Sequence, residues 1–154
     1  MTGPRSAHAH LLDTNLLLRW ANLLDPQRPV VLAALRKLRR QGQVLHTTPQ
    51  NYVEFWSGAT RPLAVNGLGL TPAQAGRLVQ RLRPLFPLLA ETPAIFDQWL
   101  QVVAAAAVSG RQVHDARLVA VMRAHGVTHL LTFNVGDFTR YQSLGIVPVH
   151  PSAL

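Results

Sequence analysis

Four acidic residues stand where a hydrolytic metal site could be built. They are Asp13, Glu54, Asp115 and Asp137, in the tracts LLDTN, NYVEFW, VHDARL and LLTFNVGDF, and Asn134 accompanies the last of them. The chain has only seven acidic residues, so these four carry more than half of its negative charge. Carboxylates that are brought together repel one another unless a cation lies between them. Hard divalent ions prefer such oxygen ligands, so the pattern favours a pocket for Mg²⁺ or Mn²⁺.

Each of these residues also has an ordinary structural interpretation. Asp13 could simply cap a helix, and Asp115 could be a helix-start acid. Asn134 and Asp137 could form a turn. Glu54 shares its helical face with Gln50, and periodicity leaves open whether that face meets solvent or the pocket. The chemical interpretation therefore depends on all of them meeting in one place.

The elements that must position these residues follow from the hydrophobic pattern. Short apolar runs alternate with helical periods, which predicts an α/β fold with a parallel sheet flanked by helices. Prolines at 84 and 87 weaken the third predicted strand. Sites in such sheets form at the carboxyl ends of strands, where Asp13 and Asn134 are expected. The five predicted strands cover residues 9–12, 44–47, 85–89, 128–132 and 146–149.

Helix boundaries are marked by local signals. Thr-Pro pairs at 48–49, 71–72 and 92–93 predict helix starts, because threonine caps and proline suits the first helical position. Other helices are predicted over 14–24, 30–41 and 115–125, and the one after Thr92 is predicted to run over 95–108. No repeat, low-complexity tail or linker divides the chain, so residues 1–154 are predicted to form a single domain.

The charge balance favours a polyanionic partner. The chain has 15 Lys and Arg against 7 Asp and Glu, a net charge of +8, which suits RNA, although it could also serve solubility alone. Trp56 and Tyr141 could stack on unpaired bases, although aromatic residues more often belong to the core or to an interface. The arginines proposed to hold the phosphate backbone include Arg36, Arg39, Arg40 and Arg111.

Composition also excludes several classes of protein. The chain has no cysteine, which excludes disulfides, thiolate zinc sites and cysteine nucleophiles. Its seven histidines lack the spacing of zinc hydrolases, which disfavours a histidine metal site. No apolar run is long enough for a membrane span, and the N-terminus reaches Asp13 before a signal-peptide core could form. We therefore expect a cytoplasmic protein.

Taken together and in this order, the tracts LLDTNLLL, NYVEFW, HDARLVAVM and LLTFNVGDF resemble those of PIN-domain ribonucleases. The likeness covers essentially the whole chain and is greatest to the VapC-type toxins of bacterial toxin–antitoxin modules. It implies a Rossmann-like, PIN-like three-layer fold with a five-stranded parallel sheet. It also implies Mg²⁺- or Mn²⁺-dependent endonucleolytic cleavage of RNA by a metal-activated water, a homodimer and inhibition by a small VapB-like antitoxin. The resemblance assigns the metal to Asp13, Glu54, Asp115 and Asp137, with Asn134, Thr14 and Asn15 as auxiliary polar residues.

Other functions remain open at this point. A degenerate PIN module could bind RNA or protein without cutting, although all four acids are present. Phosphatases of the haloacid-dehalogenase kind need Asp-x-Asp after the first strand, and this chain has Asp13-Thr14-Asn15. Receiver domains need a late lysine, and the only lysine is Lys37. The residues leave open which RNA is cut and whether one or two ions bind.

Overall fold

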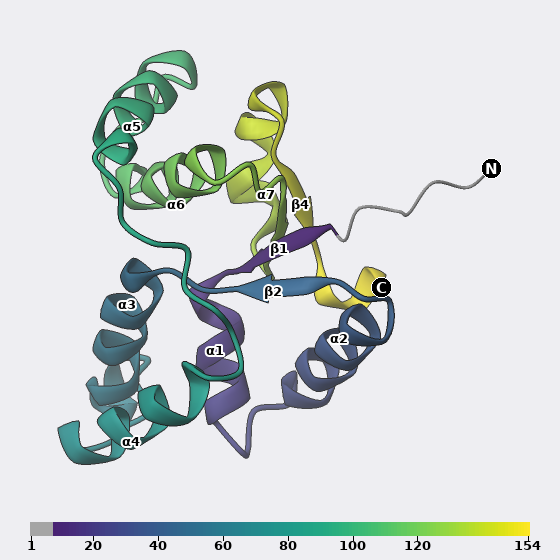
Figure 1. Cartoon of the computed structure of the whole chain (residues 1–154). Helices are drawn as coiled ribbons and strands as arrows, with labels where there is room; N and C mark the ends of the chain where they lie inside the picture. Colours follow the sequence, from purple (N-terminus) through teal and green to yellow (C-terminus); the bar gives the residue numbers. More distant parts are fainter. Residues whose placement is uncertain (1–7) are drawn as a thin grey trace.

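A parallel sheet of four short strands forms the centre of the computed structural model, which describes residues 8–154 (Figure 1). The sheet has the order β2-β1-β3-β4. Leu11 in the central strand β1 lies opposite His46 on one side and Leu130 on the other. Because all the strands run in the same direction, their carboxyl ends meet at one edge. The strands are β1 (Ala9–Leu12), β2 (Val44–His46), β3 (His129–Leu131) and β4 (Val147–Val149).

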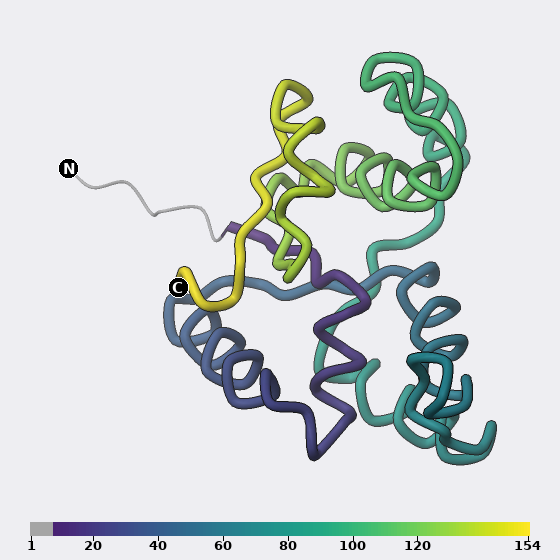
Figure 2. The backbone as a smooth tube through the Cα atoms, turned by 180° about the vertical axis from the view of Figure 1, so that it is seen from behind, coloured from purple at the N-terminus to yellow at the C-terminus, as the bar shows by residue number. Residues whose placement is uncertain are grey.

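Helices cover both faces of the sheet, which gives the expected three layers (Figures 1 and 2). Successive residues of β1 point to opposite faces, so Leu11 enters the core with α5 and α6, and Leu12 enters the core with α1, α2 and α3. The short helix α7 follows β3, and α4 packs against α3. The helices are α1 (Thr14–Ala21), α2 (Arg28–Arg40), α3 (Pro49–Thr60), α4 (Pro72–Leu82), α5 (Ala94–Ala105), α6 (Gln112–Ala124) and α7 (Val135–Phe138).

The sheet has four strands rather than five, because the strand predicted over residues 85–89 does not form, and that prediction is wrong. This segment makes only an isolated bridge, between Leu88 and Thr47 beyond the end of β2. Leu89 N donates to Thr47 O at 2.8 Å, and Thr47 N donates to Pro87 O at 3.2 Å. Pro84 and Pro87 have no N–H to donate, so the segment cannot extend this pairing into a ladder.

Two of the three predicted threonine caps are confirmed. Thr48 and Thr71 each accept from a backbone N–H three residues later, and Asn51 and Gln74 complete the two capping boxes. Thr92 is not a cap, because α5 begins after Pro93 and has no side-chain capping bond. This helix also ends at Ala105 rather than at 108, where Ala107 has already turned to φ 50°.

The loop after α3 requires glycine at position 67, where the chain passes too close to Arg61 for a side chain. Leu68 N donates to Gly58 O at 3.1 Å, and Gly69 N donates to Arg61 O at 2.9 Å, so the loop folds back onto the end of α3. A Cβ on Gly67 would lie 1.8 Å from Arg61 O, a backbone atom that cannot move aside alone.

We therefore expect Gly67→Ala to lower the free energy of unfolding by about 1–3 kcal/mol, the usual effect of overpacking. Urea denaturation measures the change. Gly136→Ala is the control, because nothing lies within 4 Å of a Cβ built there. Equal stability of Gly67→Ala and the parent would contradict this account of the loop.

No helix within residues 8–154 combines the length and the apolar character needed to cross a bilayer. The N-terminal stretch considered above for a signal peptide lies largely in residues 1–7, which are outside the described part of the chain.

Candidate active site

Asp13 is held at the carboxyl edge of the sheet, immediately after β1. Its side chain is buried, and both carboxylate oxygens are engaged. Oδ1 accepts from Thr14 N at 2.8 Å and caps α1, and Oδ2 accepts from Thr132 Oγ1 at 2.7 Å. Thr132 directly follows β3, so two neighbouring strands fix this carboxylate. Asp13 therefore caps α1 and also belongs to the group of acids at this edge of the sheet.

Glu54 lies on the side of α3 that faces Asp13 and Asp115, which answers the question that periodicity left open. Its Oε2 accepts from Thr14 Oγ1 at 2.7 Å, and its Oε1 accepts from Gln50 Nε2 at 2.8 Å. Asn51 Nδ2 donates to the same threonine hydroxyl at 3.0 Å. The first turns of α1 and α3 are thus joined around the Glu54 carboxylate, beside Asp13.

The acids interact through their charges. Burial raises the pKa of Asp13 to about 6, against hydrogen bonds from Thr132 and Thr14, and repulsion from Asp115 and Glu54 raises it further. Burial also raises the pKa of Asp115 to about 6, with further repulsion from Glu54 and Asp137. The positive charge of Arg140 opposes that shift. A cation bound among these groups would relieve both the burial and the repulsion.

The acids lie near enough to raise one another's pKa, but they do not form a complete set of metal ligands. In the part of the chain that the structure describes, no three His, Asp or Glu side chains lie close enough together to hold a metal ion as they stand. Asp137 is exposed in the first turn of α7, and its repulsion acts on Asp115. Asn134 precedes α7, and its backbone N donates to Thr132 Oγ1 at 3.0 Å. Asp13, Glu54 and Asp115 thus approach one another, with Asp137 and Asn134 at the rim.

The PIN domain family model matches residues 10–144. The chain belongs to the PIN domain family. This match spans most of β1, all of β2 and β3, and every acid discussed above, in agreement with the resemblance found in the sequence. No curated protein sequence matches the chain.

Solved structures share the PIN fold over nearly the whole chain. VapBC2 from Rickettsia felis, bound to a DNA fragment from its promoter, has a TM-score of 0.70 at 12% identity and covers 92% of this chain and 98% of its own. FitAcB from Neisseria gonorrhoeae has a TM-score of 0.68 at 18% identity and covers 94% and 99%. VapC20 from Mycobacterium tuberculosis, a toxin that cleaves the sarcin–ricin loop, has a TM-score of 0.61 at 17% identity and covers 91% and 98%. At these identities the likeness is one of fold.

The predicted substrate contacts nearest the acids occupy different environments in this PIN domain. Thr14 is buried, and its hydroxyl is committed to Glu54. Asn15 is half-buried, and its Oδ1 finds no hydrogen-bond partner within the described residues. Arg111 is exposed immediately before α6, one helical turn ahead of Asp115. Of the three, Arg111 is the one free to meet a ligand through its charge.

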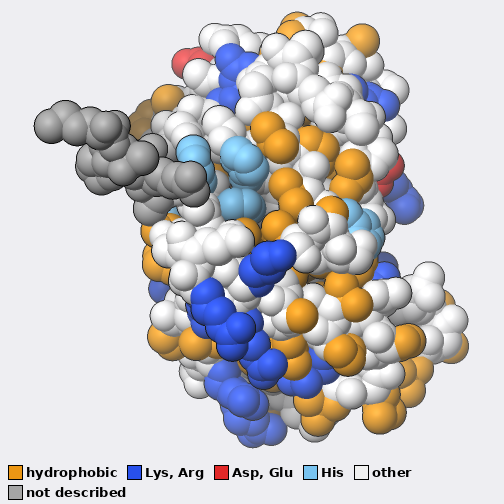
Figure 3. Space-filling view, turned by 90° about the vertical axis from the view of Figure 1, so that its right-hand side faces the viewer, with side chains coloured by type: hydrophobic (Ala, Val, Ile, Leu, Met, Phe, Trp, Pro, Cys, Tyr) orange, Lys and Arg blue, Asp and Glu red, His pale blue; other side chains and the backbone are white. Residues whose placement is uncertain are grey.

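The structure does not bring Arg36, Arg39 and Arg40 to the acids. They lie in the second half of α2, which ends just before β2 begins and therefore at the amino edge of the sheet. Lys and Arg side chains gather over α2 on the face shown in Figure 3. Arg39 also donates to Leu85 O at 2.8 Å and lies over the Phe86 ring at 5.1 Å. Their contact with RNA remains a prediction, for a surface remote from the acidic pocket.

Two polar residues of the site, Thr132 and Arg140, were missed in the sequence, and Gln50 was recognised only as a residue on the same helical face as Glu54. Gln50 stands four residues before Glu54, a spacing that could have indicated its hydrogen bond. Thr132 ends the apolar run of β3, a position that could have indicated its place beside Asp13. Arg140 had no local signal. Tyr141 is fully buried, so of the two interpretations of this side chain, base stacking and core packing, the structure supports core packing.

Proposed function

We propose that this PIN domain is a divalent-metal-dependent endoribonuclease that acts as the toxin of a toxin–antitoxin pair. The observation that carries the proposal is the buried Asp13 carboxylate, held by two strands and repelled by Asp115 and Glu54. Burial of like charges destabilises a fold unless a ligand offsets it, so such a cluster is typical of a functional site. The family membership and the fold of known toxins support the same function.

The donor set fits Mg²⁺ or Mn²⁺, because it consists of carboxylate oxygens. Asp13, Asp115 and Asp137 would hold the ion, with Glu54 beside them. When bound, such an ion supplies an acidified water and offsets negative charge on the phosphate. Thr132 and the backbone N–H of Thr14 keep the Asp13 carboxylate aimed at the edge of the sheet.

The remaining polar groups hold the second acid and the substrate. Gln50 and Thr14 orient the Glu54 carboxylate. Arg140, whose charge already acts on Asp115, and Arg111 are suited to bind the RNA backbone. Asn134 at the rim is suited to donate to a phosphate oxygen. A small VapB-like antitoxin would block this pocket, and the reaction would take place in the cytoplasm.

Incubation of the purified chain with total cellular RNA tests the proposal. We expect new RNA ends in Mg²⁺ or Mn²⁺ and none with excess EDTA. A second hypothesis, a PIN module that binds without cutting, predicts RNA binding and no new ends in either buffer. RNA binding without new RNA ends in Mg²⁺ or Mn²⁺ would contradict the proposal that this PIN domain is an enzyme.

Gln50 is expected to act as a positioning residue for Glu54. Gln50→Leu removes the hydrogen bonds to Glu54 Oε1 and to His114 O, each 2.8 Å long. Loss of an outer partner of a metal-site carboxylate reduces activity about 10–100-fold, so we expect kcat to fall by that factor with KM little changed. Gln80→Leu, at an exposed position on α4, is the control. An unchanged kcat would show that Glu54 does not need this partner.

The proposed homodimer is testable by solution mass. Exposed leucines around the end of α1 and the loop after α3 offer an apolar surface, since Leu24 is 92% and Leu63 is 79% exposed. We expect twice the monomer mass in light scattering, and a monomer for the double variant Leu24→Glu, Leu63→Glu. A parent mass equal to one chain at every concentration contradicts the dimer.

A further inference from the structure

A cavity of about 410 Å³ lies between the beginnings of α5 and α6. Its apolar wall includes Ile95, Phe96, Trp99 and Val113. The rings of Phe96 and Trp99 are stacked, with centroids 6.1 Å apart and planes 28° apart. Trp99 Nε1 donates to Val113 O at 2.9 Å and is thereby fixed, whereas Phe96 remains 64% exposed. The volume falls within the roughly 300–1,000 Å³ that is usual for ligand sites.

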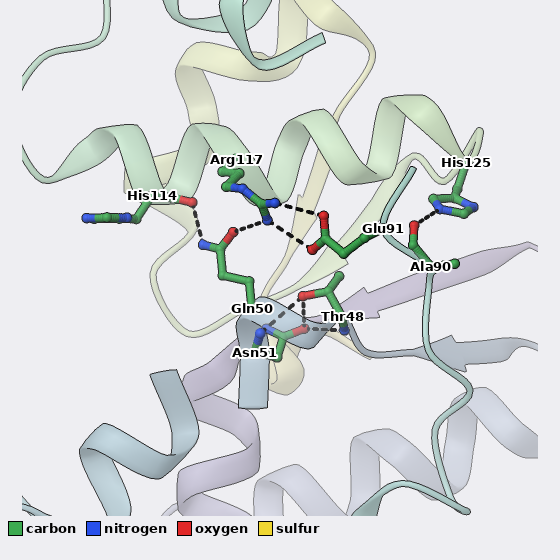
Figure 4. Close-up of polar contacts among 8 residues, drawn as sticks. All are labelled: Thr48, Gln50, Asn51, Ala90, Glu91, His114, Arg117 and His125. Atoms are coloured by element: carbon green, nitrogen blue, oxygen red, sulfur yellow. Dashed lines mark hydrogen bonds and ion pairs between the residues drawn. The ribbon is translucent and has the colours of Figure 1, made fainter. Parts of the chain in front are cut away.

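This cavity is connected to the acids through the beginning of α6 and through Gln50. His114 lines it and directly precedes Asp115 in α6. The Gln50 side-chain amide donates both to His114 O and to Glu54 Oε1, each at 2.8 Å. Figure 4 shows Gln50 between His114 and Arg117, on the side of α6 that faces α3. A ligand bound in the cavity would therefore lie next to His114 and close to Gln50, the residue that holds Glu54.

The charges around the cavity favour a neutral, flat ligand. Arg117 lines the cavity, but its guanidinium donates to Glu91 at 2.8 Å and to Gln50 at 3.2 Å. Its charge is thus offset by Glu91, and the described residues that line the cavity include no other Lys or Arg to meet a phosphate. Glu91 and Arg117 instead offer both hydrogen-bond acceptors and donors at the edge of an aromatic wall. These are the features that recognise a nucleobase.

We propose that this cavity receives an unpaired base of the RNA, from a nucleotide next to the phosphate that is cut. This inference rests on the proposed ribonuclease function and adds a specificity site to it. The base lies with its face on Phe96 and its polar edge toward Arg117 and Glu91. The net charge of +8 draws the strand to the protein, and the base site sets its register.

Binding without cleavage provides the first test. A short oligoadenylate and an abasic ribose-phosphate chain of the same length are compared in EDTA by fluorescence anisotropy. We expect the parent to bind the oligoadenylate about 5–100-fold more tightly, the range expected for stacking of one base. Phe96→Ala and Phe96→Leu should lose most of this preference, and Phe96→Trp should keep it. Leu100→Ala, one turn further along α5 and outside the cavity lining, is the matched control and should behave as the parent.

Cleavage provides the second test, with an RNA that the parent cuts and with single abasic positions placed through it. We expect one position near the cut to raise KM for the parent, and the same position to have no further effect on Phe96→Ala. If the parent cuts RNA and Phe96→Ala responds to every abasic position as the parent does, the base site is wrong and the ribonuclease stands. If no RNA is cut but the anisotropy pattern holds, the base site stands and the ribonuclease fails. If Phe96→Ala changes only the binding of an antitoxin peptide, the cavity is a protein site and the proposal is overturned.

Discussion

Replacement of Asp13 by asparagine is expected to reduce RNA cleavage by at least about 100-fold while making the metal-free protein more stable. Asparagine can still cap α1 through its side-chain oxygen, but it removes the charge that would bind the ion. A metal ion contributes several kcal/mol to the stabilisation of a phosphoryl transition state, so the loss should reach about 10²–10³-fold or more. Initial rates on a cleavable RNA in Mg²⁺ measure the effect.

The gain in stability follows from the pKa of Asp13, which burial raises from 3.8 to about 6. The unfolded chain releases this proton more easily, so ionisation destabilises the folded state fully above pH 6 and not at all below pH 3.8. Each pKa unit corresponds to about 1.4 kcal/mol, so Asp13→Asn should gain about 1–3 kcal/mol near neutral pH and nothing near pH 3. Added Mg²⁺ should stabilise the parent and reduce the difference.

Asp97→Asn is the control for both measurements, because Asp97 is exposed on α5 and lies outside the acidic pocket. It should cut RNA at the parent rate. A parent-like rate for purified Asp13→Asn in Mg²⁺ would remove the basis of the proposed mechanism. A loss of stability in Asp13→Asn at neutral pH without metal would instead contradict the destabilising burial of this charge.

Lowering the pH from about 7.5 to 5 is expected to reduce cleavage about 100-fold. Asp13 and Asp115 each have a pKa near 6, and both must be ionised to bind the ion. Two such groups are ionised together in roughly one molecule in a hundred at pH 5. The rate should therefore fall as the pH drops through 6, with a slope that approaches two.

The metal concentration distinguishes this mechanism from other causes of a falling rate. Protons and the divalent ion compete for the same carboxylates, so higher Mg²⁺ should move the midpoint to lower pH. Unfolding at low pH would not respond in this way, and circular dichroism at pH 5 checks that the fold persists. A rate that stays level between pH 7.5 and 5 would show that these two acids do not bind the catalytic ion.

Local patterns predicted much of the fold because they act within a few residues. The apolar run of β1 and the caps at Thr48 and Thr71 depend only on near neighbours, and the structure confirms them. The segment over 85–89 is apolar enough for a strand, but its two prolines limit it to one bridge. The prediction of a cap at Thr92 is wrong, because α5 begins at Ala94, and Pro93, rather than Thr92, is the residue before it.

The sequence by itself determined which acids could form a site and at which edge of the sheet Asp13 had to lie, because side-chain direction in a strand and the end of a strand are local properties. Only the tertiary structure decided that Glu54 faces the other acids and that Gln50 links Glu54 to α6. It also decided that Phe96 and Trp99 line a cavity at the beginning of α6. It also placed the arginines of α2 at the opposite edge from the acids. These relations depend on how helices distant in the chain pack across the sheet, and rules that reach only three or four residues along a helix carry no information about that packing.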